Sequence, residues 1–208
     1  MADIVIIDYQ AGNLTSVERA LEALGAKGEV TQDPGAVARS RRIIFPGVGA
    51  AGKAMSTLRD LKLDQALIEA FKKGVPILGI CLGAQIILEH SEENDTPCVG
   101  LLPGRTRALP FKPGLKIPHM GWNRVRLLRP HPVLQGVPPQ AEFYFVHGFY
   151  PAPAVLEMVL GVTEYGVEFP SLIGKGNLVA TQFHPEKSGR AGLALLNNFL
   201  AWDGRDAE

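Results

Sequence analysis

A cysteine between two glycines is the first feature of the sequence that could carry out chemistry. Gly79, Cys81 and Gly83 follow an apolar run that begins at Val75, and a segment of helical composition comes next. A strand, a tight turn and a helix with a nucleophile at the turn form a nucleophile elbow, here with cysteine in place of the usual serine. The start of the helix would favour the thiolate, because its backbone N–H groups are unpaired. The pattern alone fits a buried structural cysteine equally well.

A histidine and a glutamate two residues apart supply the other groups that a cysteine nucleophile needs. His184 and Glu186 flank Pro185, which disfavours helix at His184. On an extended segment their side chains leave the chain on the same face, so the carboxylate can fix the tautomer of the imidazole. With Cys81 they would form a nucleophile, a base and an orienting group. Each residue alone is more often a core histidine or a solvated charge, so the prediction depends on the conjunction.

Strands that alternate with helices come before the elbow and would place it at one edge of a sheet. The expected strands are residues 4–7, 29–31, 43–45 and the run from Val75, and the expected helices are residues 14–24, 63–71 and 82–90, with a weaker one that starts at Asp33. This alternation predicts a parallel sheet that is covered on both faces. Ligands of such sheets lie beyond the carboxyl ends of the strands. Pro46–Gly49 and Cys81 both follow strands, so we expect them to face the same crevice.

Prolines break the chain into short segments after residue 91. The expected strands there are residues 105–109, 123–128, 143–146 and 156–162, followed by a hairpin of 170–173 and 178–182 around 174–177. Ser188 is expected to cap a final helix. We therefore expect one α/β domain over residues 1–208: an open, mixed, mainly parallel sheet with helices on both faces and an added antiparallel strand region.

Composition and charge argue against several classes of protein. The 208 residues include 21 Lys plus Arg and 21 Asp plus Glu, so the net charge is zero and nothing indicates binding to nucleic acid or an anionic membrane. No apolar run approaches the length of a membrane span, and the N-terminus lacks the basic start of a signal peptide. Cys81 and Cys98 form neither a disulfide framework nor a metal-ligand pair. We expect a cytoplasmic protein without a metal or other cofactor.

The two catalytic motifs together resemble those of the class I, or triad, glutamine amidotransferases. Further motifs resemble one branch of that family, the glutaminase subunits of imidazole glycerol phosphate synthase from histidine biosynthesis. The likeness covers essentially the whole chain. The motifs that carry it are residues 79–85 and 182–188 for the family, and Gly12–Val17, Pro46–Gly49, His119–Asn123 and Tyr144–His147 for the branch. The run His-Met-Gly-Trp-Asn is the most specific of these signals.

The resemblance implies that the chain hydrolyses L-glutamine to glutamate and ammonia. Cys81 would attack the side-chain amide, and water would cleave the resulting glutamyl thioester. His184 would move the thiol proton to the departing ammonia, and Glu186 would orient His184. The oxyanion hole would be formed by the N–H of Leu82 and by a second N–H from the Val48–Gly49 region, which would need to turn inward.

The resemblance also names residues that would hold the glutamine substrate. The matching positions are Gln85, Glu93, Gly148 and Phe149. An acidic group at Glu93 suits the α-ammonium, although a solvated loop residue is an equally good interpretation. The family usually has Ser or Thr and then an aromatic residue, often Tyr, after the histidine that matches His147. With Gly148-Phe149 here, backbone contacts are expected to survive but a hydroxyl contact is not. Ala84 also replaces a larger residue common in the family.

The expected partner is a (β/α)8-barrel cyclase subunit, which would form a heterodimer with this chain. In the family this partner receives ammonia through its interior and binds the ribonucleotide substrate, so no phosphate-binding motif is needed here. The positions that match partner-facing ones are Asn13, Trp122, Tyr144 and Lys187. For Trp122 the competing interpretation is a core aromatic residue, and for Lys187 it is a solvated surface charge.

Three other functions stay open on the sequence alone. The chain could supply ammonia to another synthase, for example pyridoxal phosphate synthase, or it could be a catalytically silent relative that only binds a partner. It could also be a thiol hydrolase that acts on a different acyl substrate. The intact Cys81, His184 and Glu186 argue against a silent relative, and a different hydrolase would leave the run His119–Asn123 unexplained.

Overall fold

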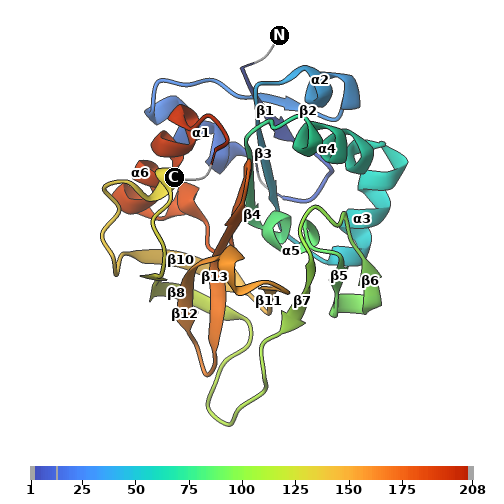
Figure 1. Ribbon diagram of the computed structural model, residues 1–208. Helices are drawn as coiled ribbons and strands as arrows, with labels where there is room; N and C mark the ends of the chain where they lie inside the picture. Colours follow the sequence, from blue (N-terminus) through green and yellow to red (C-terminus); the bar gives the residue numbers. More distant parts are fainter. Residues whose placement is uncertain (1–2, 13, 206–208) are drawn as a thin grey trace.

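The computed structural model describes residues 3–12 and 14–205, and its largest sheet contains five parallel strands (Figure 1). These are β1 (Ile4–Ile7), β2 (Glu29–Thr31), β3 (Arg42–Gly47), β4 (Ile77–Cys81) and β14 (Leu178–Thr181). They lie side by side in the order β2-β1-β3-β4-β14. β1, β4 and β14 are buried along their whole length, which is why their sequences are continuously apolar.

Helices cover both faces of this sheet and bury a separate core on each (Figure 1). The helices are α1 (Thr15–Ala23) and α6 (Gly189–Ala201) on one face, and α2 (Pro34–Arg39), α3 (Ala51–Asp60) and α4 (Leu63–Lys72) on the other. The alternation of side chains along β1 follows this division, since Ile6 packs with α1 and α6 whereas Val5 and Ile7 pack with α3 and α4. None of the helices in the described part of the chain has the length and apolar character to cross a membrane.

Antiparallel strands extend the sheet beyond β14 and build two smaller sheets beside it. The large sheet continues through β13 (Glu168–Lys175), β12 (Val159–Glu164) and β9 (Arg126–Leu127). The smaller sheets are β8 (His119–Arg124) with β10 (Glu142–His147), and β11 (Phe149–Pro153), β7 (Gly104–Ala108), β5 (His90–Ser91) and β6 (Thr96–Pro97) in that order. The expected mixed α/β fold, with an added antiparallel region, is therefore confirmed.

The helix after the elbow is shorter than expected. α5 spans Leu82–Ile86, whereas the sequence predicts helix as far as residue 90. The cause lies in the loop of residues 98–102, whose N–H groups take the carbonyls that a longer helix would use. Val99 N donates to Ile86 O (2.9 Å), and Leu101 N donates to Ile87 O (2.7 Å). The chain then turns into β5 instead of completing another turn.

Four other points of the sequence analysis need correction. The sequence pattern does not predict α3, whose first residues are small or polar. The strand predicted over residues 123–128 joins the end of β8 to β9 and omits the first four residues of β8. The strand expected from residue 156 begins at Val159, after a short 3-10 turn, η3 (Leu156–Met158). Ser188 is the residue before α6, but its hydroxyl does not cap that helix. It donates instead to His184 O (2.5 Å), and it accepts from Tyr144 N (2.9 Å).

We expect Gly83→Ala to destabilise the fold strongly, because a Cβ there would lie 1.8 Å from the carbonyl oxygen of Phe45. The clash is with backbone and requires β3 and α5 to separate, so the free energy of unfolding should fall by about 1–3 kcal/mol or more. Gly52→Ala is the matched control, since its Cβ would make an ordinary 3.4 Å contact with Thr96 Oγ1. Urea denaturation of both variants measures the difference, and equal midpoints would contradict the close approach.

Candidate active site

The backbone at Cys81 is strained in the way that a nucleophile elbow requires. Cys81 ends β4 with φ 54° and ψ −106°, a conformation that side chains rarely adopt and that costs about 1–3 kcal/mol. Its neighbour across the sheet is Gly47 of β3. A Cβ on Gly47 would lie 1.6 Å from the buried hydroxyl of Tyr9, so only glycine leaves room there. The thiol is thereby placed at the carboxyl end of the sheet, where it is 5% exposed.

His184 and Glu186 lie just past the end of β14, the strand that pairs with β4. His184 Nδ1 lies 2.7 Å from Glu186 Oε1, and both side chains are 4% exposed. The backbone of His184 is also fixed, because its N–H donates to Tyr144 O (2.9 Å). The carboxylate accepts from Nδ1–H, so the neutral ring presents an unprotonated Nε2. Nε2 has no hydrogen-bond partner among the described residues.

The electrostatics of His184 link it to Cys81. Burial lowers the pKa of His184, but its interactions with Cys81, followed by those with Glu186, outweigh burial and raise this pKa above its usual 6.5. The structure therefore brings together the three residues that the sequence selects as nucleophile, base and orienting group. An imidazole whose protonated form is stabilised in this way is a strong acceptor for the thiol proton.

A small cavity opens beside the thiol. It has a volume of about 300 Å³, at the small end of ligand pockets. Its walls contain every residue that the sequence assigns to the oxyanion hole or to glutamine binding, together with Cys81 itself and Val146. The lining residues are Val48, Gly49, Cys81, Leu82, Gln85, Glu93, Val146, Gly148 and Phe149. Ala84 is fully buried and does not line this cavity.

The two proposed oxyanion donors are not equally ready. Leu82 N lies in the first turn of α5, where N–H groups lack a partner within the helix. Val48 N donates to Ala11 O (3.0 Å), so this N–H is occupied in the structure. Gly49 has a positive φ of 104° and open space where a side chain would be, which gives this peptide freedom to rotate.

Gln85 and Glu93 face the cavity with part of their hydrogen-bonding capacity already used. Gln85 Nε2 donates to Phe149 O and to Gln182 Oε1, both at 2.9 Å, so only its Oε1 is left to accept from a ligand. Glu93 Oε2 accepts from Ala51 N (2.6 Å) at the start of α3. A ligand group held by these two residues must therefore be a donor, as an ammonium or an amide nitrogen is.

Sequence reasoning missed two residues beside the thiol. Gln182 Nε2 lies 3.7 Å from Cys81 Sγ, and the carbonyl oxygen of Val146 lies 3.9 Å from it. Gln182 belongs to the motif that contains His184, and its place at the end of β14 is the signal that could have identified it. Val146 acts through its backbone, so its side chain carries no such signal.

Two of the predicted partner-facing residues, Trp122 and Tyr144, lie opposite each other on the two-stranded sheet of β8 and β10. Trp122 is 56% exposed, and its ring meets the half-buried ring of Tyr144 edge to face, with centroids 6.3 Å apart. Tyr144 in turn lies 6.4 Å from the ring of His184, so the aromatic pair leads from the surface to the base. Lys187 is exposed next to Glu186. Asn13 lies outside the described residues.

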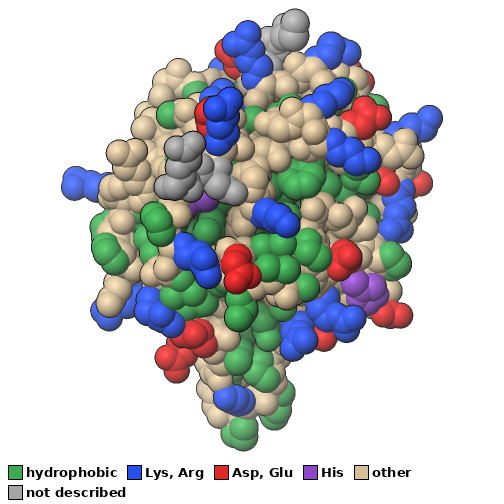
Figure 2. Space-filling model, viewed as in Figure 1, with side chains coloured by type: hydrophobic (Ala, Val, Ile, Leu, Met, Phe, Trp, Pro, Cys, Tyr) green, Lys and Arg blue, Asp and Glu red, His purple; other side chains and the backbone are tan. Residues whose placement is uncertain are grey.

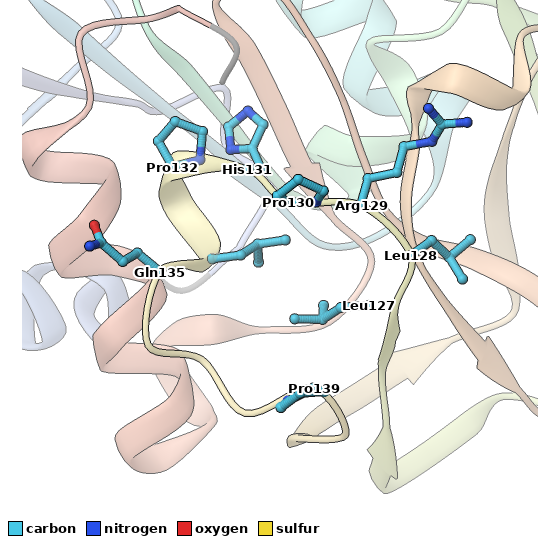
Figure 3. A pocket seen from close by; sticks show the side chains of 9 residues that line it. Leu127, Leu128, Arg129, Pro130, His131, Pro132, Gln135 and Pro139 are labelled. Atoms are coloured by element: carbon cyan, nitrogen blue, oxygen red, sulfur yellow. The ribbon is translucent and has the colours of Figure 1, made fainter. Parts of the chain in front are cut away.

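A larger groove lies elsewhere and lacks a nucleophile. It encloses about 680 Å³ between β9 and the turn η2 (Pro132–Leu134), and aliphatic and proline side chains surround most of it (Figure 3). Its lining residues are Leu127, Leu128, Arg129, Pro130, His131, Pro132, Leu134, Gln135 and Pro139. None of them is a triad residue, so chemistry rather than size identifies the active site.

Comparison with known proteins decides the family. The model of the family "Glutamine amidotransferase class-I" matches residues 5–202 of this chain. The chain belongs to the class I glutamine amidotransferases. This amidotransferase is 49% identical over 205 residues to "Imidazole glycerol phosphate synthase subunit HisH" of Nitratidesulfovibrio vulgaris, with 96% of each chain covered. It is 50% identical over 200 residues to the protein of the same name in Moorella thermoacetica, with 96% of this chain and 94% of the relative covered.

Solved structures support the amidotransferase fold at low sequence identity. A structure described as a glutamine amidotransferase aligns with a TM-score of 0.72 at 19% identity, over 95% of this chain and 98% of its own. PurLQS from Thermotoga maritima aligns with a TM-score of 0.73 at 18% identity, over 97% and 99% of the two chains. At such identities the likeness concerns the fold alone.

Two buried histidines lie behind the wall of the cavity. His119 Nδ1 and His147 Nε2 are 2.9 Å apart, and the side chains are 3% and 5% exposed. Burial lowers the pKa of His119 from 6.5 to about 4 and that of His147 to about 3. Both rings are therefore neutral in the fold at pH 7.

We expect these histidines to make the amidotransferase acid-sensitive. Their pKa values are lower in the folded than in the unfolded chain, so their contribution to stability is present above pH 6.5 and is lost as the pH falls towards 4 and then 3. Each titrating group changes the unfolding free energy by up to about 1.4 kcal/mol per pH unit. His147→Asn, which cannot titrate, should flatten the fall in a denaturation series between pH 7 and 4. Parallel curves for the two proteins would refute this account.

Proposed function

We propose that this chain is the glutaminase subunit of an imidazole glycerol phosphate synthase and hydrolyses L-glutamine to glutamate and ammonia. The relatives at 49% and 50% identity carry the name of that synthase subunit and match over nearly their whole length. The observation that carries the proposal is the buried pair of His184 and Glu186, which interacts with Cys81, together with a cavity of about 300 Å³ that Cys81 itself lines. Residues 1–208 would form one catalytic domain.

The hydrolysis follows from what each group can donate and accept. Cys81 Sγ attacks the amide carbon of glutamine as His184 Nε2 takes the thiol proton. The C–N bond then breaks, and the protonated imidazole gives its proton to the leaving nitrogen, which departs as ammonia. Water attacks the thioester while His184 accepts a proton from it, and glutamate leaves as the thiol re-forms. Glu186 stabilises the imidazolium in both halves of the reaction.

The oxyanion of each tetrahedral intermediate needs at least two donors. Leu82 N–H supplies one. A second from the peptides at Val48 or Gly49 requires the peptide to turn; for Val48 the bond to Ala11 O must break. Because one such donor is typically worth two to three orders of magnitude in rate, the subunit should be nearly inactive until a partner stabilises the turned form.

Glutamine would lie in the cavity with its donors towards the acceptors that remain free. The α-ammonium pairs with Glu93, whose carboxylate is held in place by Ala51 N. Gln85 Oε1 accepts from a second nitrogen of the substrate, since both N–H groups of Gln85 are used. Gly148 and Phe149 contribute backbone contacts along one wall.

The partner would be a (β/α)8-barrel cyclase that docks on the face of the β8–β10 sheet that carries Trp122 and takes up ammonia there. Trp122 and Met120 are 56% and 64% exposed on adjacent outward positions of β8, an apolar surface typical of an interface core. Positive and negative side chains are interspersed on the face seen in Figure 2. The two free cysteines, Cys81 and Cys98, support a reducing, cytoplasmic location.

Cys81→Ala should abolish glutamine hydrolysis and leave the fold intact. Loss of the nucleophile removes the covalent step, so glutamate release should fall by at least about a thousandfold. Cys98→Ala is the matched control, because its thiol contacts Thr96 O and lies outside the cavity. Glutamate release is measured in complex with the partner, and circular dichroism checks folding. Turnover that survives in the Cys81 variant would rule out the assignment.

Trp122→Ala should weaken the complex with the cyclase by about tenfold or more, because a large exposed aromatic is a typical binding hot spot. Leu156→Ala is the control. It removes another apolar side chain, 77% exposed, from η3, which lies outside the β8–β10 sheet. Titration of each variant with the cyclase, followed by glutaminase stimulation, gives the affinity. An unchanged affinity of the Trp122 variant for the cyclase would contradict this docking surface. Capture of a different synthase by the native chain would contradict the cyclase as partner.

A further inference from the structure

We propose that His119 and His147 are positioning residues, which hold the wall of the glutamine pocket through a chain of hydrogen bonds with one fixed direction. Neither histidine touches the reacting atoms, and the hydrolytic steps leave their motifs without a role. The inference rests on the proposed function, because it concerns how the same pocket binds its substrate.

The contacts form a continuous path from β8 to the cavity. His119 and His147 are directly opposite each other in the β8–β10 pairing, with Nδ1 of His119 2.9 Å from Nε2 of His147. His147 Nδ1 lies 2.8 Å from the carbonyl oxygen of Phe149, a residue that lines the cavity. At the other end, Asn123 Nδ2 lies 3.3 Å from His119 Nε2.

The chemistry of the two ends fixes every proton between them. A carbonyl oxygen only accepts, so His147 carries its proton on Nδ1 and presents a bare Nε2. His119 must then donate from Nδ1, and its own Nε2 accepts from the amide of Asn123. That amide is oriented independently, because Asn123 Oδ1 accepts from Arg124 N (2.8 Å) and Nδ2 also donates to Glu164 O (3.0 Å). The lowered pKa values of both rings agree with this neutral arrangement.

The surroundings keep water and alternative rotamers out of the path. His119 is stacked between the ring of Tyr165, at a centroid distance of 3.9 Å, and the ring of Phe145, at 4.9 Å. The ring of Phe169 packs against His147 at 5.2 Å. Buried and stacked in this way, the imidazoles cannot exchange their partners for solvent.

The path ends on an oxygen that also orients a substrate-binding residue. Phe149 O accepts from His147 Nδ1 and from Gln85 Nε2. The second N–H of Gln85 donates to Gln182 Oε1, and Gln182 Nε2 approaches Cys81 Sγ at 3.7 Å. The donated bond from His147 therefore fixes the Phe149 peptide, and that peptide keeps Gln85 turned so that Oε1 is its free acceptor.

The test compares two variants of His119 in the complex with the partner. His119→Leu removes the donor to His147, whereas His119→Asn retains an amide N–H near the place of Nδ1. We expect the leucine variant to raise KM for glutamine about fivefold to tenfold, the effect of losing one buried hydrogen bond, with kcat changed less than about twofold. The asparagine variant should recover most of the affinity. Tyr165→Phe keeps the stacked ring and removes a hydroxyl that bonds Lys116 O, so it should leave KM unchanged.

A second measurement holds even if the leucine variant does not fold. Nitrogen-15 NMR of the native chain at pH 7 should show both histidines neutral and protonated at Nδ1, whereas Nε2–H is the usual tautomer of a free imidazole. An Nε2–H tautomer at either residue, or a native KM in a folded His119→Leu variant, would overturn the proposed chain of hydrogen bonds. These results differ from a failure of the proposed function, in which the native complex itself would not hydrolyse glutamine.

Discussion

The strained backbone of Cys81 is the constraint on which the rest of the active site depends. A positive φ at a residue with a side chain persists only where the surroundings leave no relaxed alternative. Here β4 is buried between β3 and β14, and α5 begins without any intervening residue. Gly83 allows β3 to approach the turn so closely that no side chain fits there, and Gly47 leaves room for the buried hydroxyl of Tyr9. The turn thereby holds the thiol at the strand ends, where it interacts with His184 just past the end of β14.

Three buried histidines near this turn show how partners, rather than burial, decide protonation. All three lose free energy when charged, because burial removes water. Cys81 and Glu186 reverse that effect at His184 and raise its pKa. His119 and His147 face no carboxylate in the contacts of their rings, and their pKa values are lowered. One ring is thereby suited to exchange protons, and the other two are suited to hold them at fixed atoms.

The sequence predicts the parts of the site that local patterns encode. The elbow and the His-x-Glu pair each occupy a few adjacent residues, so spacing and residue type indicate them, and alternating strands and helices predict the edge of the sheet where they meet. Contacts made by distant backbone groups leave no such trace. The end of α5 at Ile86 depends on N–H groups from the loop after Cys98, and the orientation of Val48 N depends on Ala11 O. The protons of His119 and His147 follow only from the register of β8 and β10.

Backbone contacts also hold the segment Gly148-Phe149, where the sequence resemblance leads us to expect a hydroxyl that this chain lacks. A hydroxyl is missing there, yet the segment is fixed without one, since Leu109 N donates to Gly148 O (2.9 Å) and two side-chain donors converge on Phe149 O. When main-chain atoms form the wall of a pocket, the residues that must be specified are those that hold the main chain, here Gln85 and His147. Loss of either donor should therefore disturb this wall of the pocket more than a change of the side chain at 148 or 149.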